Sequence, residues 1–437
     1  MVPDSSLSRR QVLASGGAAG ALLGGGVLAR RLLPTAAGRS PDGWPMVARD
    51  PGGTAYAPEA DPPTDGVKVR WKYGLPPWPG ADVRPAPVVA GGVVYAVGPH
   101  ESMPPHSPEL VALSASEGSV LARARRPVRS APAVAPARAY RARTVATLET
   151  PTFDPHRLVG LPGADAGTGG WLGGGESAPW TGTDATRWTA SVDADSDSYS
   201  RIRFGGATTP PPVAVGDALV TFFRGTLAAV DGSSGAVRWT SDEGLPATRP
   251  AVRDGAAYVV GPDRGVRSYD LATGASTDLS VDLPGRPMYL AATPARLYVA
   301  GQGWVSAHSF DGSADWRATF PEGASVPAGP VAVADGTVYV RRADTTATRL
   351  CALDADDGSV RWVCEGVTPS EAAYLPAATD DAVYVPTDAG GLAAVDADDG
   401  SVRWRFDPGT EPCSPAAIVD DAVYVVGSEH LYALEEP

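Results

Sequence analysis

The chain of 437 residues is unusual for what it lacks: it has no asparagine, two lysines and two glutamines. Its basic side chains are therefore almost all arginine, and 50 acidic residues against 36 basic ones give a net charge of −14 at pH 7. Proteins that bind nucleic acid neutralise phosphates with a surplus of lysine and arginine. This charge balance excludes nucleic acid as an expected partner.

Two explanations fit the charge pattern. A surface of aspartate and arginine with almost no lysine or amide suits very high salt, because hydrated carboxylates and net repulsion keep such a protein in solution. In this respect the composition resembles that of proteins from salt-loving archaea. The alternative is a GC-rich genome with a mildly acidic bias. The sequence favours a halophilic protein and leaves both explanations open.

Cysteine is also scarce, and Cys351, Cys364 and Cys413 form neither a disulfide framework nor a metal-binding set. No C-x-x-C-H haem-attachment motif occurs. Cys351 and Cys364 lie on the two arms of one expected hairpin at positions of equal parity, which predicts that both face the same side. A disulfide between them is one alternative. In direct register they would be diagonal neighbours, a poor geometry for a bridge.

The N-terminus carries a long apolar run. A twin arginine, Arg9 and Arg10, precedes a glycine-rich apolar stretch from Val12 to Ala29, and the segment resembles a twin-arginine export signal. We expect residues 1–37 to be this signal segment and residues 38–437 to form a folded body outside the cytoplasm. An uncleaved N-terminal membrane anchor is the alternative, because the run is marginally long enough to span a bilayer.

The body shows no sustained helical period, but one phrase recurs along it. LCALDADDGSVRWVC begins at residue 350, and LAAVDADDGSVRWRF begins at residue 392. An apolar phrase such as PVAVADGTVYV, at residue 330, precedes the copies. Each unit therefore reads as four short strands separated by Gly or Asp turns. Units of four strands that recur at intervals of roughly 40 to 50 residues predict the blades of a β-propeller.

The predicted fold is an all-β, eight-bladed propeller of four-stranded antiparallel blades. The last unit lacks its fourth strand, whereas residues 67–74 read as a fourth strand with no unit before it. Pairing the two would close the ring through the chain's N- and C-terminal strands. Seven blades or a split into two domains are the alternatives. A glycine-rich insertion at about 162–187 makes the second blade the least regular.

The most regular copies follow the pattern A-x-D-x-x-x-G-x-x-x-W. Alanine would allow close approach of a neighbouring blade, aspartate would accept hydrogen bonds from its own turn, and glycine would take a positive φ. Tryptophan would bury its ring against the adjacent blade and donate its N–H to a carbonyl there. The repeated unit is thus predicted to be a structural joint. The residues are Ala229, Asp231, Gly235 and Trp239; Ala352, Asp354, Gly358 and Trp362; and Ala394, Asp396, Gly400 and Trp404.

This repeated pattern resembles the PQQ-like, tryptophan-docking repeat of the quinoprotein alcohol dehydrogenases and of a non-enzymatic outer-membrane assembly lipoprotein that shares their propeller. The resemblance covers nearly all of residues 67–437. For the dehydrogenases it implies pyrroloquinoline quinone (PQQ) in the central funnel, with an adjacent cysteine pair, a calcium ion held by Glu, Asn and Asp, and a catalytic aspartate. This chain has no Cys-Cys pair and no asparagine, and its five histidines are scattered without metal-ligand spacing.

One acidic stretch is spaced like the start of a calcium loop, with Asp193, Asp195 and Asp197 at its first, third and fifth positions. Ser198 stands where such a loop needs glycine, and Phe204 stands where it needs a bidentate glutamate. These aspartates are weak metal candidates, and an acidic solvated loop is the simpler interpretation.

The sequence therefore favours an exported, monomeric, non-catalytic propeller that acts as a protein-binding or assembly scaffold at the extracellular face of the membrane. We expect no catalytic residues and no cofactor, and the N-terminus is a candidate for membrane association. The alternative is a divergent PQQ-dependent dehydrogenase of alcohols or sugars, which would need PQQ and calcium at funnel residues that the sequence does not identify.

Overall fold

The computed structural model describes a ring of β-sheets, and the residues it describes contain no helix. The chain divides into residues 1–37 and 38–437, and every described residue belongs to the second unit. A helix long and apolar enough to cross a membrane does not occur in that described part. The described residues are 43–75, 85–99, 108–128, 130–137, 142–149, 157–164, 186–192, 210–241, 244–245, 248–261, 263–320, 329–343, 347–371, 374–409 and 413–437.

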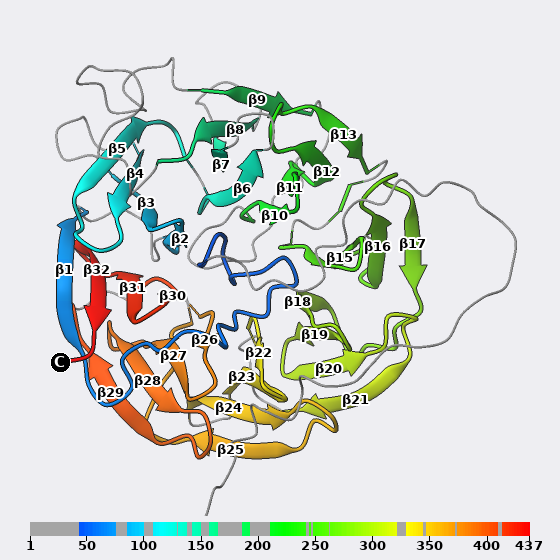
Figure 1. Cartoon of the computed structure of the whole chain (residues 1–437). Coiled ribbons are helices and arrows are strands. Elements are labelled where there is room, and N and C mark those ends of the chain that lie inside the picture. The colour runs from blue at the N-terminus through cyan, green and yellow to red at the C-terminus, as the bar shows by residue number, and fades with distance from the viewer. Residues whose placement is uncertain are drawn as a thin grey trace, which may run out of the picture. The chain divides into compact units, whose positions relative to one another are not determined.

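The first four blades each contain four antiparallel strands in sequence order, from the axis to the rim (Figure 1). Their inner strands are nearly continuous runs of valine, alanine and other apolar residues, which suits strands buried on both faces. Their strands are β2 (Val88–Ala90), β3 (Val93–Pro99), β4 (Pro108–Ser114) and β5 (Val120–Arg125); β6 (Ala133–Ala137), β7 (Ala142–Glu149), β8 (Arg157–Pro162) and β9 (Trp188–Ser191); β10 (Val213–Val215), β11 (Ala218–Phe223), β12 (Thr226–Asp231) and β13 (Val237–Thr240); β14 (Ala251–Arg253), β15 (Ala256–Val260), β16 (Val266–Asp270) and β17 (Ser276–Leu279).

The remaining four blades repeat this arrangement, and the last one takes its rim strand from the N-terminal part of the chain. Inner strands are almost wholly buried, whereas rim strands expose alternate side chains. The strands are β18 (Pro287–Ala292), β19 (Leu297–Gly301), β20 (Trp304–His308) and β21 (Ala314–Thr319); β22 (Ala332–Ala334), β23 (Thr337–Ala343), β24 (Thr348–Asp354) and β25 (Val360–Cys364); β26 (Ala377–Ala378), β27 (Ala382–Pro386), β28 (Leu392–Asp396) and β29 (Val402–Phe406); β30 (Ala417–Val419), β31 (Ala422–Val426), β32 (His430–Glu435) and β1 (Lys68–Gly74).

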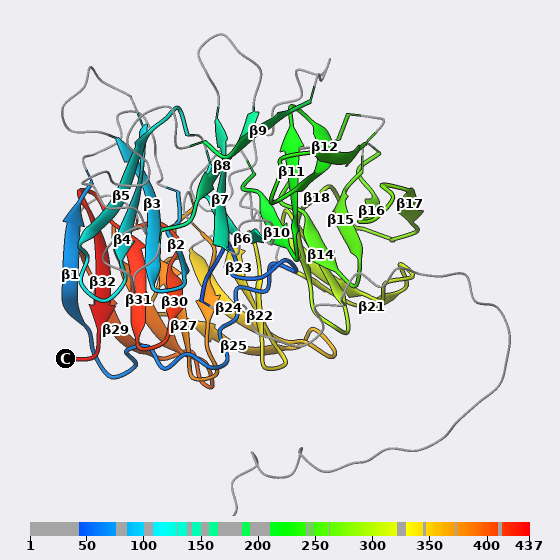
Figure 2. The ribbon, with the colours of Figure 1, turned by 45° about the horizontal axis from the view of Figure 1, so that its top comes forward.

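The ring closes where β1 pairs with β32 (Figure 2), which confirms the predicted fold and its count of eight blades. The ladder runs from Lys68 opposite Glu435 to Gly74 opposite His430. Arg70 reinforces it, because its guanidinium contacts the carboxylates of Glu435 and Asp421, each at 2.5 Å. The alternatives of seven blades and of two separate domains are wrong.

Tryptophans on the rim strands join neighbouring blades. In six joints the indole N–H donates to a main-chain carbonyl oxygen at 2.8–3.1 Å. In five of them the acceptor directly follows the third strand of the next blade. In the sixth joint the third strand of the next blade is β32, which ends at Glu435. There the carbonyl of Pro63 accepts the hydrogen bond instead. The pairs are Trp71 and Ala115, Trp188 and Gly232, Trp239 and Leu271, Trp316 and Ala355, Trp362 and Ala397, and Trp404 and Pro63.

Gly400 shows why the turn of the joint needs glycine. Its φ is +76°, and the ring of Trp362 from the preceding blade lies directly on it. A Cβ atom at this position would lie 2.5 Å from Cε3 of Trp362, far inside van der Waals contact. The glycine therefore meets two demands at once, the left-handed backbone and the space for the ring.

Two joints have no tryptophan on the rim strand: Ala122 stands at its place opposite Ala112 in the first blade, and Thr277, next to Asp278, stands at its place opposite Ser268 in the fourth. In the second of these, Phe310 from the turn of the next blade lies 5.4 Å from Tyr258, ring centroid to ring centroid. Tyr258 is the equivalent of Tyr384 in the seventh blade. The ring centroid of Tyr384 lies 5.8 Å from that of Trp404, the rim tryptophan of the same blade. An aromatic ring from the other side of the joint thus takes the tryptophan's place.

The structure does not bring Cys351 and Cys364 together. Both thiols are free and buried. A β-bulge between Ala352 and Leu353 shifts the register, so that Cys364 pairs with Leu350 while Cys351 pairs with Val363. The two cysteines therefore face opposite sides of the sheet. The prediction that the two side chains lie on the same side of the sheet is wrong. It assumed a hairpin without a bulge, and the one-residue shift at the bulge turns Cys364 to the other side.

Burial predicts that the thiols are inert in the native protein. Burial raises the pKa of Cys351 to about 11, although Arg342 acts in the opposite direction. We expect no alkylation by iodoacetamide at pH 8 and three alkylated cysteines after denaturation without a reductant, each counted by mass spectrometry. A denatured, unreduced chain with one reactive cysteine would instead demonstrate a disulfide.

The joints also predict acid sensitivity. The Arg361 side chain, with the amide of Asp356, holds the pKa of Asp354 below its usual range. A lowered folded-state pKa stabilises the fold above the unfolded pKa of 3.8, and this contribution is lost as the pH falls through the folded value. We expect Asp354→Asn to lower stability at pH 7 by at most about 1 kcal/mol, because the pair is near the surface. Urea titrations at pH 7 and pH 3 should show a smaller acid loss in the variant than in the parent chain.

Candidate functional site

Residues 43–61, here called the axial segment, line the inside of the ring and are drawn in blue at its centre (Figure 1). The segment lies outside every repeat of the sequence. Its two ends lie on the same face of the ring. Gly43 is beside Ala90, at the turn after β2, and the Asp61 amide donates to the carbonyl of Asp420, in the turn after β30, at 2.8 Å. The segment is thus a loop inserted from one face.

The axial segment is held mainly through its backbone. Six blades each present one inner-strand N–H to the axis, at the equivalent position of the blade, and a carbonyl of the segment accepts each at 2.8–2.9 Å. We call these six N–H groups the axial tier. An inner strand has an open edge, and the axial segment covers it in these six blades. The donor–acceptor pairs are Val89 to Trp44, Val134 to Pro45, Val252 to Pro51, Ala292 to Gly52, Val333 to Thr54 and Ala378 to Ala55.

Apolar side chains anchor the segment as well. Trp44 is 1% exposed and belongs to the largest core cluster, together with Val47 and Ala55. Met46 belongs to the cluster of the second, third and fourth blades. Three non-glycine residues have left-handed backbones, Ala48 at φ +61°, Arg49 at +65° and Ala55 at +52°. Such conformations are unfavourable for residues with a Cβ, so the surrounding contacts impose them.

A buried charge cluster fixes the turn of the segment. The Asp50 carboxylate accepts hydrogen bonds from the amides of Gly53, at 2.9 Å, and Thr54, at 3.2 Å, and from the Thr54 hydroxyl. Arg249 enters from the fourth blade, and its guanidinium donates to the Asp50 carbonyl at 2.7 Å. Arg49 donates to the carbonyl of Tyr56. Side chains distant in sequence thus hold one tight turn on the axis.

Burial sets the electrostatics of this cluster. It raises the pKa of Asp50, although Thr54, Arg249 and Arg49 act in the opposite direction. It lowers the pKa of Arg249 to about 10, with the charge of Asp50 opposing the shift. Arg249 therefore remains a cation at neutral pH. The cluster serves to hold the segment.

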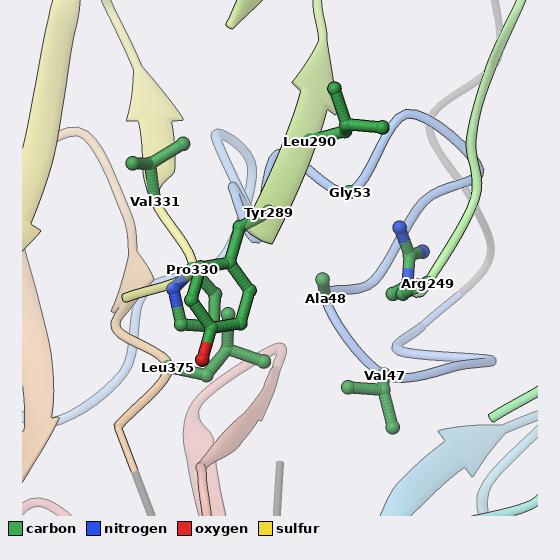
Figure 3. Close-up of a pocket in the computed structure, with 9 residues that line it drawn as sticks. All are labelled: Val47, Ala48, Gly53, Arg249, Tyr289, Leu290, Pro330, Val331 and Leu375. Atoms are coloured by element: carbon green, nitrogen blue, oxygen red, sulfur yellow. The ribbon is translucent and has the colours of Figure 1, made fainter. Parts of the chain in front are cut away.

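The cavity beside the segment is small (Figure 3). It has a volume of about 20 Å³ and is lined on one side by Val47 and Ala48 and on the other by Tyr289, Pro330 and Leu375. Pockets for cofactor-sized ligands usually have volumes of about 300–1,000 Å³. Beside the axial segment, the described residues thus leave a cavity far smaller than a cofactor such as PQQ would need.

The residues singled out in the sequence lie elsewhere. The docking aspartates, glycines and tryptophans are in the joints between blades. Asp193, Asp195 and Asp197 lie outside the described residues, as does most of the insertion at 162–187. Among the described residues, no group of three or more His, Cys, Asp or Glu side chains is arranged to hold a metal ion. The axial segment, with Asp50 and Arg249, was missed because it carries no repeated phrase.

Comparison with solved structures places the fold among known propellers. BamB from Moraxella catarrhalis matches 85% of this chain and 98% of its own, with 14% identity and a TM-score of 0.55. A quinohaemoprotein alcohol dehydrogenase from Pseudomonas putida matches 91% of this chain and 82% of its own, with 14% identity and a TM-score of 0.64. The corresponding enzyme from Comamonas testosteroni matches 90% and 80%, with 14% identity and a TM-score of 0.61. These likenesses show the fold alone.

Sequence comparison is more specific about the family. A search of curated protein sequences found no match. The family model described as outer membrane protein assembly factor BamB matches residues 178–277 and 301–436, together more than half of the chain. Those residues include the three regular docking motifs and three of the four strands of the closing blade, β30, β31 and β32. On the matched repeats and the eight-bladed ring together, the chain belongs to the BamB-like family of PQQ-repeat propellers.

Proposed function

We propose that this protein is an exported, non-catalytic propeller that binds protein partners at the outer face of the membrane as a scaffold. The occupied axis carries the proposal. Residues 43–61 fill the place where the resemblance to the dehydrogenases would put a quinone, and the six hydrogen bonds of the axial tier hold them there. Binding of other proteins is then the function that the ring supports best.

The cellular setting belongs to the same proposal. A twin arginine before an apolar run supports export by the twin-arginine route, with residues 1–37 as signal or anchor. The excess of acidic residues and the near absence of lysine support a high-salt environment. A monomer is expected. The partner proteins would then be found at the cell surface.

Two measurements test the function. The purified protein is incubated with PQQ and calcium and is then examined by absorbance and for dye-linked oxidation of alcohols and sugars. We expect neither a bound chromophore nor dye reduction. In parallel, the tagged protein is used to capture partners from a membrane fraction in high salt, and we expect specific protein partners. A bound quinone with turnover would establish the dehydrogenase alternative and overturn the proposal.

A further inference from the structure

We propose that the axial tier is a binding site for a polypeptide segment that turns around the axis, that residues 43–61 are its resident occupant, and that a partner engages the propeller by placing a segment of this kind there in exchange. The inference deepens the proposed function and rests on it, since it names the chemistry by which a protein partner is recognised. It begins from the six axial hydrogen bonds, which already show this site holding a polypeptide.

The recognition is through the main chain. All six donors are backbone N–H groups, and all six acceptors are backbone carbonyls, so none of these bonds depends on the identity of a side chain. At two blades the contact is reciprocal, because the amides of Trp44 and Ala57 donate to the carbonyls of Val89 and Ala378. Main-chain recognition at a sheet edge accepts many sequences, and pockets for a few side chains add specificity.

The resident segment fits this site imperfectly. Ala48, Arg49 and Ala55 are in the left-handed region, where a Cβ is unfavourable. Burial of the Asp50 carboxylate and the Arg249 guanidinium opposes their charged forms. A segment with glycine at the strained positions would therefore bind the same tier more tightly than the resident one does.

The resident segment has a physical route out of the axis. Both of its ends, at Gly43 and Asp61, lie on one face of the ring. It is therefore a loop that withdraws without threading through the propeller. When it withdraws, the six N–H groups lose their acceptors together, although they belong to six separate blades.

The test uses the full chain and a fluorescein-labelled synthetic peptide of residues 43–61. Trp44→Ala weakens the resident segment and leaves the tier intact, and Asp50→Asn is a milder second variant. Val69→Ala, at a rim position that is 41% exposed, is the matched control. We expect the peptide to bind the Trp44→Ala chain with a Kd at least about tenfold lower than for the parent and the control. A peptide with glycine at positions 48, 49 and 55 should bind more tightly still.

Hydrogen–deuterium exchange locates the binding. In the Trp44→Ala chain, the inner-strand peptides that contain the six axial amides should exchange faster by a common factor, and added peptide should restore their protection. Absence of peptide binding to both folded variants would overturn the inference, as would binding that leaves the six amides unprotected. Failure to capture any membrane partner would instead overturn the proposed function and would not alter the peptide titration.

Discussion

Replacing Trp44 with alanine is expected to lower the free energy of unfolding by about 3–5 kcal/mol, the range for truncation of a buried large aromatic side chain. Trp44 is 1% exposed and is among the largest fully buried side chains, although it precedes all the repeats. Its removal would leave a cavity between the axial segment and the first blade. Urea denaturation followed by circular dichroism measures the loss.

The control for this prediction is Val69→Ala on the rim, where exposure of 41% predicts a change within about 0.5 kcal/mol. Limited trypsin digestion adds a local readout. Arg49 is 7% exposed in the parent chain, so cleavage after it should be slow there and faster in Trp44→Ala. A loss of less than about 1 kcal/mol for Trp44→Ala, without faster cleavage, would contradict the central position of the segment.

Gly400→Ala should destabilise the fold much more than Gly255→Ala, although both glycines have a positive φ, +76° and +82°. At Gly255 a Cβ would meet nothing within 4 Å, so only the left-handed backbone counts, at about 1–2 kcal/mol. At Gly400 the Cβ would lie 2.5 Å from the Trp362 ring, and overpacking adds about 1–3 kcal/mol. Parallel urea titrations of the two variants measure the difference.

A double-mutant cycle isolates the ring as the cause. With Trp362→Ala as background, the cost of Gly400→Ala should fall to that of Gly255→Ala, because only the backbone term remains. Equal costs for the two glycines in the parent chain would show that the tryptophan moves aside easily. The turn glycine would then be required for its φ alone.

Much of the fold could be predicted because repeats encode it redundantly. Most blades repeat the same apolar strands and the same turn, so an irregular unit such as the second blade does not hide the architecture. The closure could be predicted as well, because a spare strand at 67–74 matched a missing one after Leu434. The register of the third and fourth strands was less visible. The bulge at Ala352 and Leu353 reversed the side that Cys364 faces.

The axial segment was harder to predict, because it is held mainly by backbone groups. Backbone carbonyls at residues 44–55 make its six hydrogen bonds, and every residue type has a carbonyl. The side chains that anchor the segment, such as Trp44 and Asp50, occur once and carry no periodic signal. Arg249, which completes the turn, is about 200 residues away in sequence, as its contact with Asp50 records.

The sequence by itself determined the eight blades, their four-stranded order, the joints and the strand that closes the ring, because these features follow from local patterns that recur along the chain. Only the tertiary structure decided what lies on the axis. An open inner edge is created when the blades assemble, and the segment that covers it is selected by main-chain hydrogen bonds and by the space left between blades, neither of which leaves a pattern in the sequence.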